Sequence, residues 1–393
     1  MFLSYTDEQL ELQRELDRYF GDLLTPQVRT GLRAEPRCGP TTRRLRRRLG
    51  QDGWLGVSWP PEFGGRGMSV LAEQIVFDAG YRAGVPLPFL GLKTVGPTLM
   101  AFGSADQKAF HLPAIVAGEV EWAIGYSEPE AGSDLAALTT RAVRDGDEYV
   151  INGSKIFTTG ADTADYIWLA ARTGPVEARH RNLSVFIVPT GSPGFSATPL
   201  PVMTDKHTAF SFYENVRVPA ANLVGAENDG WKIITSQLNR ERAGIAARSG
   251  SWSQQAFDDV VTWAREHTTP SGRRIIDLPS ARMPLARAWT LVEAMRLSNW
   301  RVTAALAAGT LTAAESSAAK VLTTEAHQEV ARLLLEVMGP AGALKAGSPG
   351  AELQGRIEQE YRTAVLYTFG GGNNEIQREI IAWTGLNLPR GTR

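Results

Sequence analysis

The chain has 393 residues, of which 43% are hydrophobic and 21% charged, a balance typical of a globular protein with two or three structural domains. The formal net charge of -1 gives no global electrostatic reason to expect nucleic acid or an anionic membrane as a partner. The single cysteine, Cys38, excludes an intrachain disulfide and fits a reducing compartment, so we expect a cytoplasmic protein.

Residues 6–117 carry apolar side chains at intervals of three and four, which predicts a series of helices. Thr6 followed by Gln9 is typical of a capping box at the start of the first helix. Residues 1–14 therefore predict a surface helix and not a signal peptide. No apolar run in the sequence is long enough to span a bilayer.

A basic run occupies residues 43–48 within this helical part. Leu45 and Leu49 lie one helical turn apart in it, which favours a helix whose charged face is exposed to solvent. A contact with a phosphate group is the alternative interpretation.

Residues 121–226 show a hydrophobic period of two, which predicts a β domain. Asp145-Gly146 and Asn152-Gly153 are typical hairpin turns, and two hairpins in succession predict an antiparallel meander. The predicted strands cover residues 122–126, 139–144, 148–151, 155–159, 166–171, 183–188 and 210–218.

The pattern becomes helical again after Gly230 and predicts a four-helix bundle. The four long segments cover residues 233–248, 283–307, 313–338 and 351–368. We therefore expect an α+β fold with an N-terminal all-helical domain (1–120), a middle antiparallel β domain (121–226) and a C-terminal helical bundle (227–393).

The most informative motif is the polar segment at 127–134, Ser-Glu-Pro-Glu-Ala-Gly-Ser-Asp, which directly follows the apolar run 122–126. Polar groups at the end of a buried strand need hydrogen-bond partners once water is removed. The segment therefore predicts a ligand-binding loop.

This motif, together with five others in the same order, resembles the acyl-CoA dehydrogenase family, including bacterial steroid and fatty acyl-CoA dehydrogenases. The resemblance implies FAD bound between the β domain and the C-terminal bundle, and removal of two hydrogens from the α and β carbons of an acyl thioester. It also implies an electron-transfer flavoprotein or another electron acceptor, and a homo- or hetero-tetramer. The other motifs are Trp59-Pro60-x-Glu62-Phe63-Gly64-Gly65, Leu112-Pro113 before Gly118-Glu119, Asn152-Gly153-x-Lys155, Gly230-Trp231 and Gly370-Gly371-Gly372-Asn373-Asn374-Glu375-Ile376-Gln377-Arg378.

The family likeness also implies which residues hold the flavin, because in the family the ring lies along the segments that match 124–127 and 157–159. Ordinary strand and turn chemistry is the alternative explanation for the hydroxyl groups among them. The implied cofactor-binding residues are Tyr126, Ser127, Gly132, Ser133, Phe157, Thr158, Thr159, Asn373 and Glu375.

The catalytic base departs from the commonest family pattern. Many members carry a glutamate in the C-terminal loop, where this chain has Gly371, whereas others carry it in a Leu-x-x-Glu-Arg pattern that matches residues 238–242. The resemblance therefore implies Glu241 as the base that removes the α-proton. Helical spacing independently places Glu241 on an apolar face, where desolvation raises a carboxyl pKa; a structural ion pair is the alternative. The other residues on that face are Trp231, Ile234, Leu238 and Ile245.

The substrate contacts predicted from the same likeness are Ser133, Leu238, Arg242 and Gly371. Three consecutive glycines at 370–372 remove bulk, which suggests a branched, cyclic or otherwise large acyl group. The same glycines also fit a tight turn into the last helix, capped by Asn374 with Gln377 as its reciprocal partner.

Two segments that serve a neighbour's FAD in the family are altered here. Where the family has Arg-x-x-Phe-Gly, this chain has Thr-Thr-Pro-Ser-Gly at residues 268–272, and the possible replacements for the arginine are Arg265, Arg273 and Arg274. Where the family has Gln-x-x-Gly-Gly, the segment in this chain begins with Glu336. Both changes suggest a pair of related but unequal subunits. The alternatives are a flavin-dependent oxidase or monooxygenase on the same fold, or a non-catalytic partner subunit. The five histidines show no ligand spacing, so no metal site is predicted.

Overall fold

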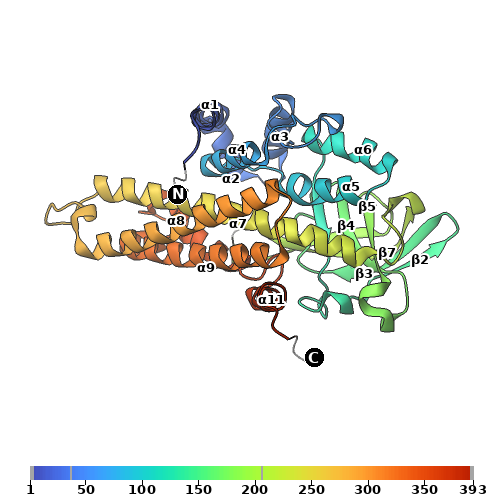
Figure 1. Cartoon of the computed structure of the whole chain (residues 1–393). Helices are drawn as coiled ribbons and strands as arrows, with labels where there is room; N and C mark the ends of the chain where they lie inside the picture. Colours follow the sequence, from blue (N-terminus) through green and yellow to red (C-terminus); the bar gives the residue numbers. More distant parts are fainter. Residues whose placement is uncertain (1–3, 36–37, 205–206, 390–393) are drawn as a thin grey trace.

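The computed structural model describes residues 4–35, 38–204 and 207–389. Figure 1 shows short N-terminal helices packed above long C-terminal helices, with a β-sheet at one end of the molecule. The predicted α+β class, with helical, β and helical parts in that order along the chain, is confirmed.

The N-terminal part is built from helices whose starts are fixed by capping residues. The predicted capping box at α1 is present. The Thr6 hydroxyl oxygen accepts from the Gln9 backbone N–H, and the Gln9 side-chain oxygen accepts from the Thr6 backbone N–H. The helices are α1 (Asp7–Leu23), α2 (Pro26–Ala34), α3 (Pro40–Gln51), α4 (Val70–Ala83), α5 (Gly96–Phe102) and α6 (Ala105–Val116).

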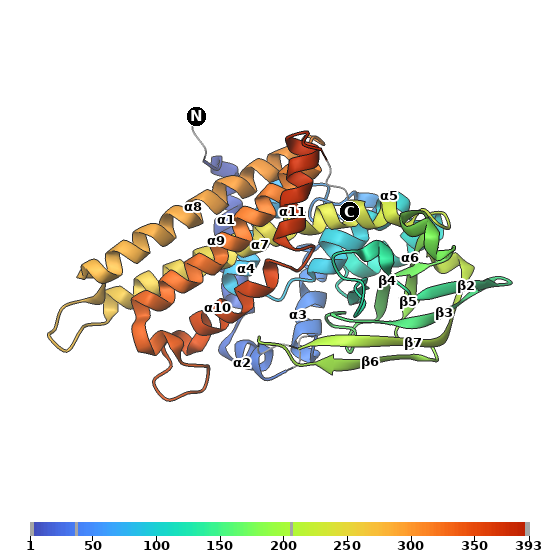
Figure 2. The same ribbon diagram turned by 90° about the horizontal axis from the view of Figure 1, so that it is seen from below.

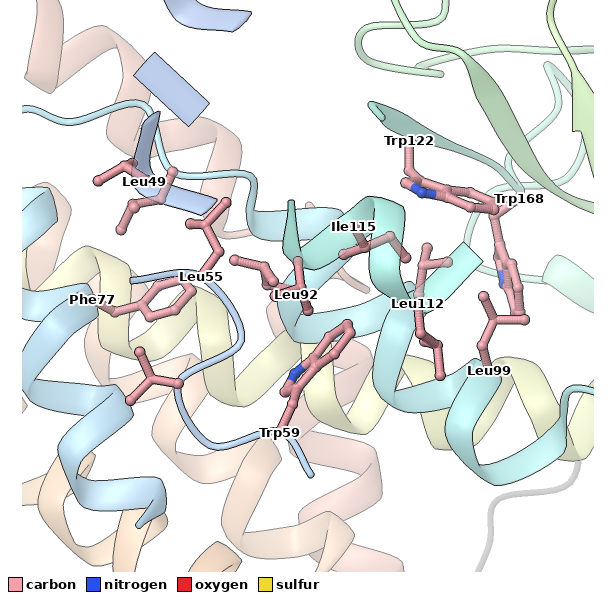
Figure 3. Packing of buried hydrophobic residues seen from close by; sticks show 14 of the residues in the cluster. Leu49, Leu55, Trp59, Phe77, Leu92, Leu99, Leu112, Ile115, Trp122 and Trp168 are labelled. Carbon is pink, nitrogen blue, oxygen red and sulfur yellow. The ribbon is translucent and has the colours of Figure 1, made fainter. Parts of the chain in front are cut away.

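A hydrophobic core joins these helices to the sheet. Trp59, Phe77 and Leu92 lie near one another between the N-terminal helices, and the same cluster continues to Trp122 and Trp168 in the β domain (Figure 3). All five side chains are almost completely buried. Burying a large apolar side chain contributes about 1.5–3 kcal/mol, so this continuous core fixes the helical part against the sheet.

The basic run at 43–48 is not the fully solvated face that the sequence predicts. Arg46 is buried and pairs with the buried Glu121 just before the first strand, while Arg43 pairs with Asp165 at 3.2 Å. The remaining arginines of the run are exposed. The prediction fails because helix α3 packs its Leu45 face against the protein interior and carries Arg46 inward with it.

The described residues of the β domain form one mixed sheet of eight strands, so the prediction of a purely antiparallel domain is wrong. Its strand order is β6-β7-β3-β2-β4-β5-β8, and β1 pairs with β4 outside this path. Most neighbours are antiparallel, but β1 and β2 each pair with β4 in parallel. The strands are β1 (Trp122–Gly125), β2 (Arg141–Asp145), β3 (Glu148–Lys155), β4 (Tyr166–Arg172), β5 (Leu183–Pro189), β6 (Phe195–Leu200), β7 (Thr208–Pro219) and β8 (Leu223–Val224).

The predicted hairpin at Asn152-Gly153 is wrong. Strand β3 continues through these residues and pairs with both β2 and β7, with a change of register between Ile151 and Gly153. Gly153 has φ +148°, and a Cβ there would lie 2.6 Å from the Thr140 hydroxyl oxygen. Gly153 therefore marks a β-bulge where its backbone lies close to Thr140, and it does not form a turn.

The C-terminal part contains the predicted long helices, with the first one much longer than expected. In Figures 1 and 2, α7 runs through the helical bundle and continues beside the β domain, where it contacts β5. Helix α9 packs against α7, α8, α10 and α11. The helices are α7 (Gly230–Glu266), α8 (Pro279–Ala307), α9 (Ala313–Met338), α10 (Arg356–Tyr367) and α11 (Asn374–Ile380). Within the described part of the chain, none of the helices combines the length and apolar character needed to cross a membrane.

Candidate active site

The polar loop after β1 is held in place by a buried ion pair. The Glu128 carboxylate accepts from the backbone N–H groups of Thr139 and Thr140 and from Lys155 Nζ at 2.8 Å. Burial alone would raise the pKa of Glu128, but the Lys155 charge and the hydrogen bonds bring it down to about 2. Lys155 also donates to the Tyr126 carbonyl, so Glu128 and Lys155 fix both ends of the turn.

The tip of this loop presents two backbone N–H groups that no described residue satisfies. Gly132 and Ser133 are exposed, and their backbone N–H groups donate to no acceptor among the described residues. The Ser133 hydroxyl accepts from Asn373 Nδ2 at 2.9 Å and so connects the loop to the start of α11. Adjacent free amide donors of this kind suit an anionic or carbonyl oxygen of a ligand.

The second predicted flavin segment carries an exposed aromatic ring. Phe157 is 56% exposed and has a left-handed backbone with φ +60°, an unfavourable combination for a large apolar residue. The Thr159 hydroxyl bonds to Thr208 at 2.8 Å, and the buried Thr158 hydroxyl bonds to Ser211 at 3.1 Å. Phe157 is therefore a surface on which a planar ring could pack, whereas the Thr158 hydroxyl is already engaged.

Tyr126 and Ser127 directly follow β1, where the polar loop begins. Tyr126 is buried, and its hydroxyl accepts from Trp168 Nε1 at 3.0 Å. Burial raises the pKa of Tyr126 well above its ordinary value, so its hydroxyl stays protonated. Ser127 is half-buried and its carbonyl accepts from the Ile156 N–H.

Glu241 faces the glycine loop from helix α7. A Cβ built on Gly371 would lie 3.7 Å from Glu241 Oε1 and 2.9 Å from Ile245 Cδ1. Gln237, one turn earlier, donates to Glu241 Oε2 at 2.8 Å. Burial raises the pKa of Glu241, and the Gln237 hydrogen bond and the nearby Arg242 and Lys320 charges only partly oppose this.

The glycine loop between α10 and α11 is anchored by a lysine that sequence reasoning missed. Lys320 is fully buried in α9, and its ammonium donates to the carbonyls of Thr368 (3.0 Å) and Gly372 (2.7 Å) and to Asn374 Oδ1 (2.8 Å). Arg242 Nε adds a long bond of 3.4 Å to the Gly371 carbonyl. A lysine on an otherwise buried helix face was the available sequence signal for such an anchor.

The cap of α11 differs by one residue from the prediction. Asn373, and not Asn374, is the N-cap, because its side-chain oxygen accepts from the Ile376 N–H at 2.8 Å. Asn374 instead turns inward and donates to Glu325 at 3.0 Å. Gln377 accepts a bond from Ser317 and does not return one to the cap. The burial of Asn374 against α9 decides the choice between two neighbouring asparagines.

The structure thus brings the predicted residues into two groups. Glu241, Arg242 and Gly371 meet at one place, with Leu238 on the same helix packing toward the N-terminal core. The second group lies toward the β domain, where the bond between Asn373 and Ser133 links it to the glycine loop. It comprises Tyr126, Ser127, Gly132, Ser133, Phe157, Thr158 and Thr159, with Asn373 and the exposed Glu375 at the start of α11.

The two altered segments lie at the surface. Arg274 is held by Asp277 in a hydrogen-bonded ion pair beyond the end of α7, and Glu336 pairs with Arg332 at 3.2 Å near the end of α9. Arg265 and Arg273 are exposed. In the part of the chain that the structure describes, no three His, Cys, Asp or Glu side chains gather in a way that could hold a metal ion.

The fold and this site agree with the family comparisons. Sequence models for the acyl-CoA dehydrogenase N-terminal, middle and C-terminal domains match residues 6–119, 123–214 and 228–386. The chain belongs to the acyl-CoA dehydrogenase family, whose members are FAD-binding flavoproteins, and is an oxidoreductase of that class.

Individual relatives match from end to end. The acyl-CoA dehydrogenases FadE26 and FadE29 of Mycobacterium tuberculosis are 45% and 46% identical, covering 100% and 99% of this chain and the same shares of their own. The crystal structure of the ChsE4-ChsE5 complex from the same organism has a TM-score of 0.92 at 45% identity, with both chains fully covered. A structure described as the Tcur3481-Tcur3483 steroid ACAD has a TM-score of 0.93 at 46% identity, also over both whole chains.

Proposed function

We propose that this acyl-CoA dehydrogenase uses FAD to remove two hydrogens from an acyl thioester, with Glu241 taking the α-proton. The observation that carries the proposal is the position of Glu241: its carboxylate lies beside the empty Cβ position of Gly371 in a partly desolvated setting. A carboxylate elsewhere on α7 would not face the C-terminal loop, where the family's alternative base stands.

The neighbouring groups suit the enolate-like charge that builds up when an α-proton leaves. The Gly371 N–H donates to no acceptor among the described residues, so it is available to the thioester oxygen. Lys320 and Arg242 fix the carbonyls on either side of this loop and so orient that donor. Gln237 orients the Glu241 carboxylate through one of its two oxygens and leaves the other free to accept a proton.

The residues present fit FAD. The free N–H groups of Gly132 and Ser133 and the exposed Phe157 ring need partners of the kind that the flavin and its polar chain provide. We propose that Ser127, Thr159, Asn373 and Glu375 border the cofactor, with the buried side chains of Tyr126 and Thr158 supporting it from beneath. When bound, the flavin supplies the acceptor for the hydride that leaves the β-carbon.

The test is the visible absorption spectrum of the purified chain, followed during anaerobic addition of acyl-CoA thioesters. We expect bound flavin whose absorption bleaches, and we expect Glu241→Gln to retain flavin but lose at least about 100-fold in the rate of bleaching, as for loss of a general base. Glu227→Gln, which changes a carboxylate bonded to Tyr149 in the β domain, is the matched control. Full activity of Glu241→Gln would disprove the assignment of the base.

We propose a large, ring-bearing acyl group as the substrate. Three glycines leave the loop beside Glu241 without side chains, and one of the similar structures is described as a steroid ACAD. We expect steroid side-chain thioesters to bleach the flavin faster than short straight-chain ones at equal concentration. Turnover confined to short straight chains would contradict this.

We propose further that the working enzyme is a heteromer of two related chains and passes electrons to an electron-transfer flavoprotein. Two of the most similar structures are described by paired names, ChsE4-ChsE5 and Tcur3481-Tcur3483. The exposed Glu336 and the missing arginine in 268–272 leave this chain poorly suited to a neighbour's anionic cofactor. Flavin per chain and native mass, measured with and without a coexpressed paralogue, test the assembly; a fully flavinated homotetramer would contradict it.

A further inference from the structure

Arg248 stands out because it is a half-buried guanidinium with no acceptor. It makes no hydrogen bond or ion pair with any described residue, and its Nε is buried without a partner. A guanidinium carries five N–H donors and stays charged in proteins, so leaving it unpaired away from water is costly. Such a group is retained at a cost to stability, which points to a role outside folding.

Four aromatic rings surround this cation. The Arg248 guanidinium carbon lies 4.1 Å from the centre of the Trp252 ring, and the rings of Tyr81, Tyr367 and Phe89 follow at 5.7, 5.9 and 6.0 Å. Cation–π contacts use the flat face of the guanidinium, so its N–H groups, which point outward in the plane, remain available.

A second unsatisfied donor lies beside it. The Tyr81 hydroxyl is buried and has no hydrogen-bond partner among the described residues. The Arg248 guanidinium carbon lies 5.7 Å from the centre of the Tyr81 ring, and its charge opposes the rise that burial causes in the Tyr81 pKa. The nearby Glu73 does not neutralise Arg248, because it is paired with Lys93 at 2.6 Å. Two unpaired donors of this kind would both be satisfied by one ligand oxygen group.

Arg248 lies on the same side of α7 as Glu241. The two residues are two helical turns apart, about 10 Å along the axis. Ile245, between them, reaches the Cβ position of Gly371, and Phe89 packs so closely on α7 that a Cβ on Gly244 would lie 2.5 Å from its ring. Tyr367, the last residue of α10, leads directly into the glycine loop. The aromatic box around Arg248 therefore continues from the proposed site of proton removal.

We infer that Arg248 and Tyr81 bind an oxygen at the far end of the acyl group, a ketone or carboxylate about 10 Å beyond the reacting carbons. This inference rests on the proposed function and specifies its substrate: an acyl group with an apolar body, suited to the aromatic rings, and a polar terminus. Arg248 is thus a specificity residue and takes no part in the chemical step.

The experiment compares acyl-CoA ligands of equal length that end in a methyl group, a ketone or a carboxylate. Binding to the flavin-loaded protein is measured by calorimetry, and turnover by anaerobic flavin bleaching. We expect the oxygen-ended ligands to bind about 10- to 100-fold more tightly than the methyl-ended one. Tighter binding of the carboxylate than of the ketone would identify an anion site. Equal binding of the two would identify a site for a neutral oxygen.

Arg248→Met removes the donors and keeps most of the packing. We expect this variant to lose the preference, mainly through a higher KM for the oxygen-ended ligands, with thermal stability equal or higher. Tyr81→Phe should lose part of the preference. Arg282→Met, at an exposed position of α8, is the matched control and should retain it.

Equal binding of all three ligands by the wild-type protein, or a preference that survives in Arg248→Met, would overturn the inference. Failure of the proposed function is a separate outcome: none of the thioesters would bleach the flavin, whatever their relative affinities. The calorimetric measurement does not depend on turnover, so the two failures can be distinguished.

Discussion

At the scale of single residues, the site depends on a carboxylate that lies beside a glycine. Glu241 Oε1 is 3.7 Å from the Cβ position of Gly371, and burial raises its pKa above the ordinary 4.5. The family likeness predicted both residues, and helical spacing independently put Glu241 on an apolar face. Their proximity required the fold, since 130 positions separate them along the chain.

The raised pKa of Glu241 predicts the acid side of the pH profile. The base must be ionised, so kcat should rise with pH through a midpoint above 4.5, and this limb should disappear in Glu241→Gln. Because folding favours the neutral carboxyl, its ionisation destabilises the native state as pH rises from 4.5 through the raised value. Glu241→Gln should therefore be at least as stable as the wild type at neutral pH, as thermal unfolding will test. A midpoint at or below 4.5 would contradict the burial argument.

Gly371→Ala tests how much room the site requires. The new methyl group would meet Ile245 at 2.9 Å, on a backbone with φ +69° that alanine adopts only under strain. We expect a loss of about 1 kcal/mol of stability and slower flavin bleaching, more pronounced for large acyl groups. Gly370→Ala is the matched control, because its φ is not positive and its nearest neighbour is 3.3 Å away. Equal effects of both variants would argue against a special role for Gly371.

At the scale of elements, the loop after β1 owes its shape to the buried pair of Glu128 and Lys155. Glu128→Gln would leave the Lys155 ammonium buried without a counter-charge, which costs about 3–5 kcal/mol. Burial lowers the pKa of Lys155 to about 8 even beside Glu128, and loss of the Glu128 charge would lower it further. Lys155 can then lose its proton in the variant, so the penalty should shrink between pH 7 and 9. Glu130→Gln, exposed in the same loop, should change little. Denaturant unfolding at both pH values measures this, and a penalty independent of pH would contradict it.

The glycine loop depends in the same way on Lys320. Lys320→Met removes the donor shared by the Thr368 and Gly372 carbonyls and the Asn374 side chain. We expect kcat to fall by about 10- to 100-fold through misplacement of the loop, with faster hydrogen exchange in residues 368–374. Lys345→Met, at an exposed position, is the control. Wild-type kcat in Lys320→Met would show that the loop holds its place without the lysine.

The elements also show where sequence reasoning succeeds and where it fails. The long helices and β7 were predictable from hydrophobic period, because burial of one face imposes that period, whereas β4 and β5 are buried on both faces and appear as continuous apolar runs. Gly153 was misread as a turn because a glycine at a bulge and a glycine in a hairpin look alike without the partner strand. The choice between Asn373 and Asn374 as cap depended on Lys320, a contact between distant parts of the chain.

At the scale of the whole molecule, one guanidinium joins the N-terminal helices to the β domain. Arg46 of α3 pairs with Glu121 at the entry to β1 and donates to the carbonyls of Pro86 (2.6 Å) and Leu87 (3.3 Å) beyond α4. Both charged side chains are buried, so each makes the burial of the other tolerable. In the sequence, the basic run that contains Arg46 is typical of a solvated surface, because the oxygen atoms that Arg46 binds belong to residues 40 and more positions away.

Arg46→Met should therefore weaken the docking of the helical part onto the sheet. It leaves Glu121 buried and unpaired, and we expect a loss of about 3–5 kcal/mol in denaturant unfolding, whereas Arg47→Met at the next, exposed position should have an effect of no more than about 0.5 kcal/mol. Adding Glu121→Gln to Arg46→Met should cost less than the sum of the single changes, because it removes the stranded charge. Additive losses would mean that the two side chains contribute independently and that their ion pair does not couple the helical part to the β domain.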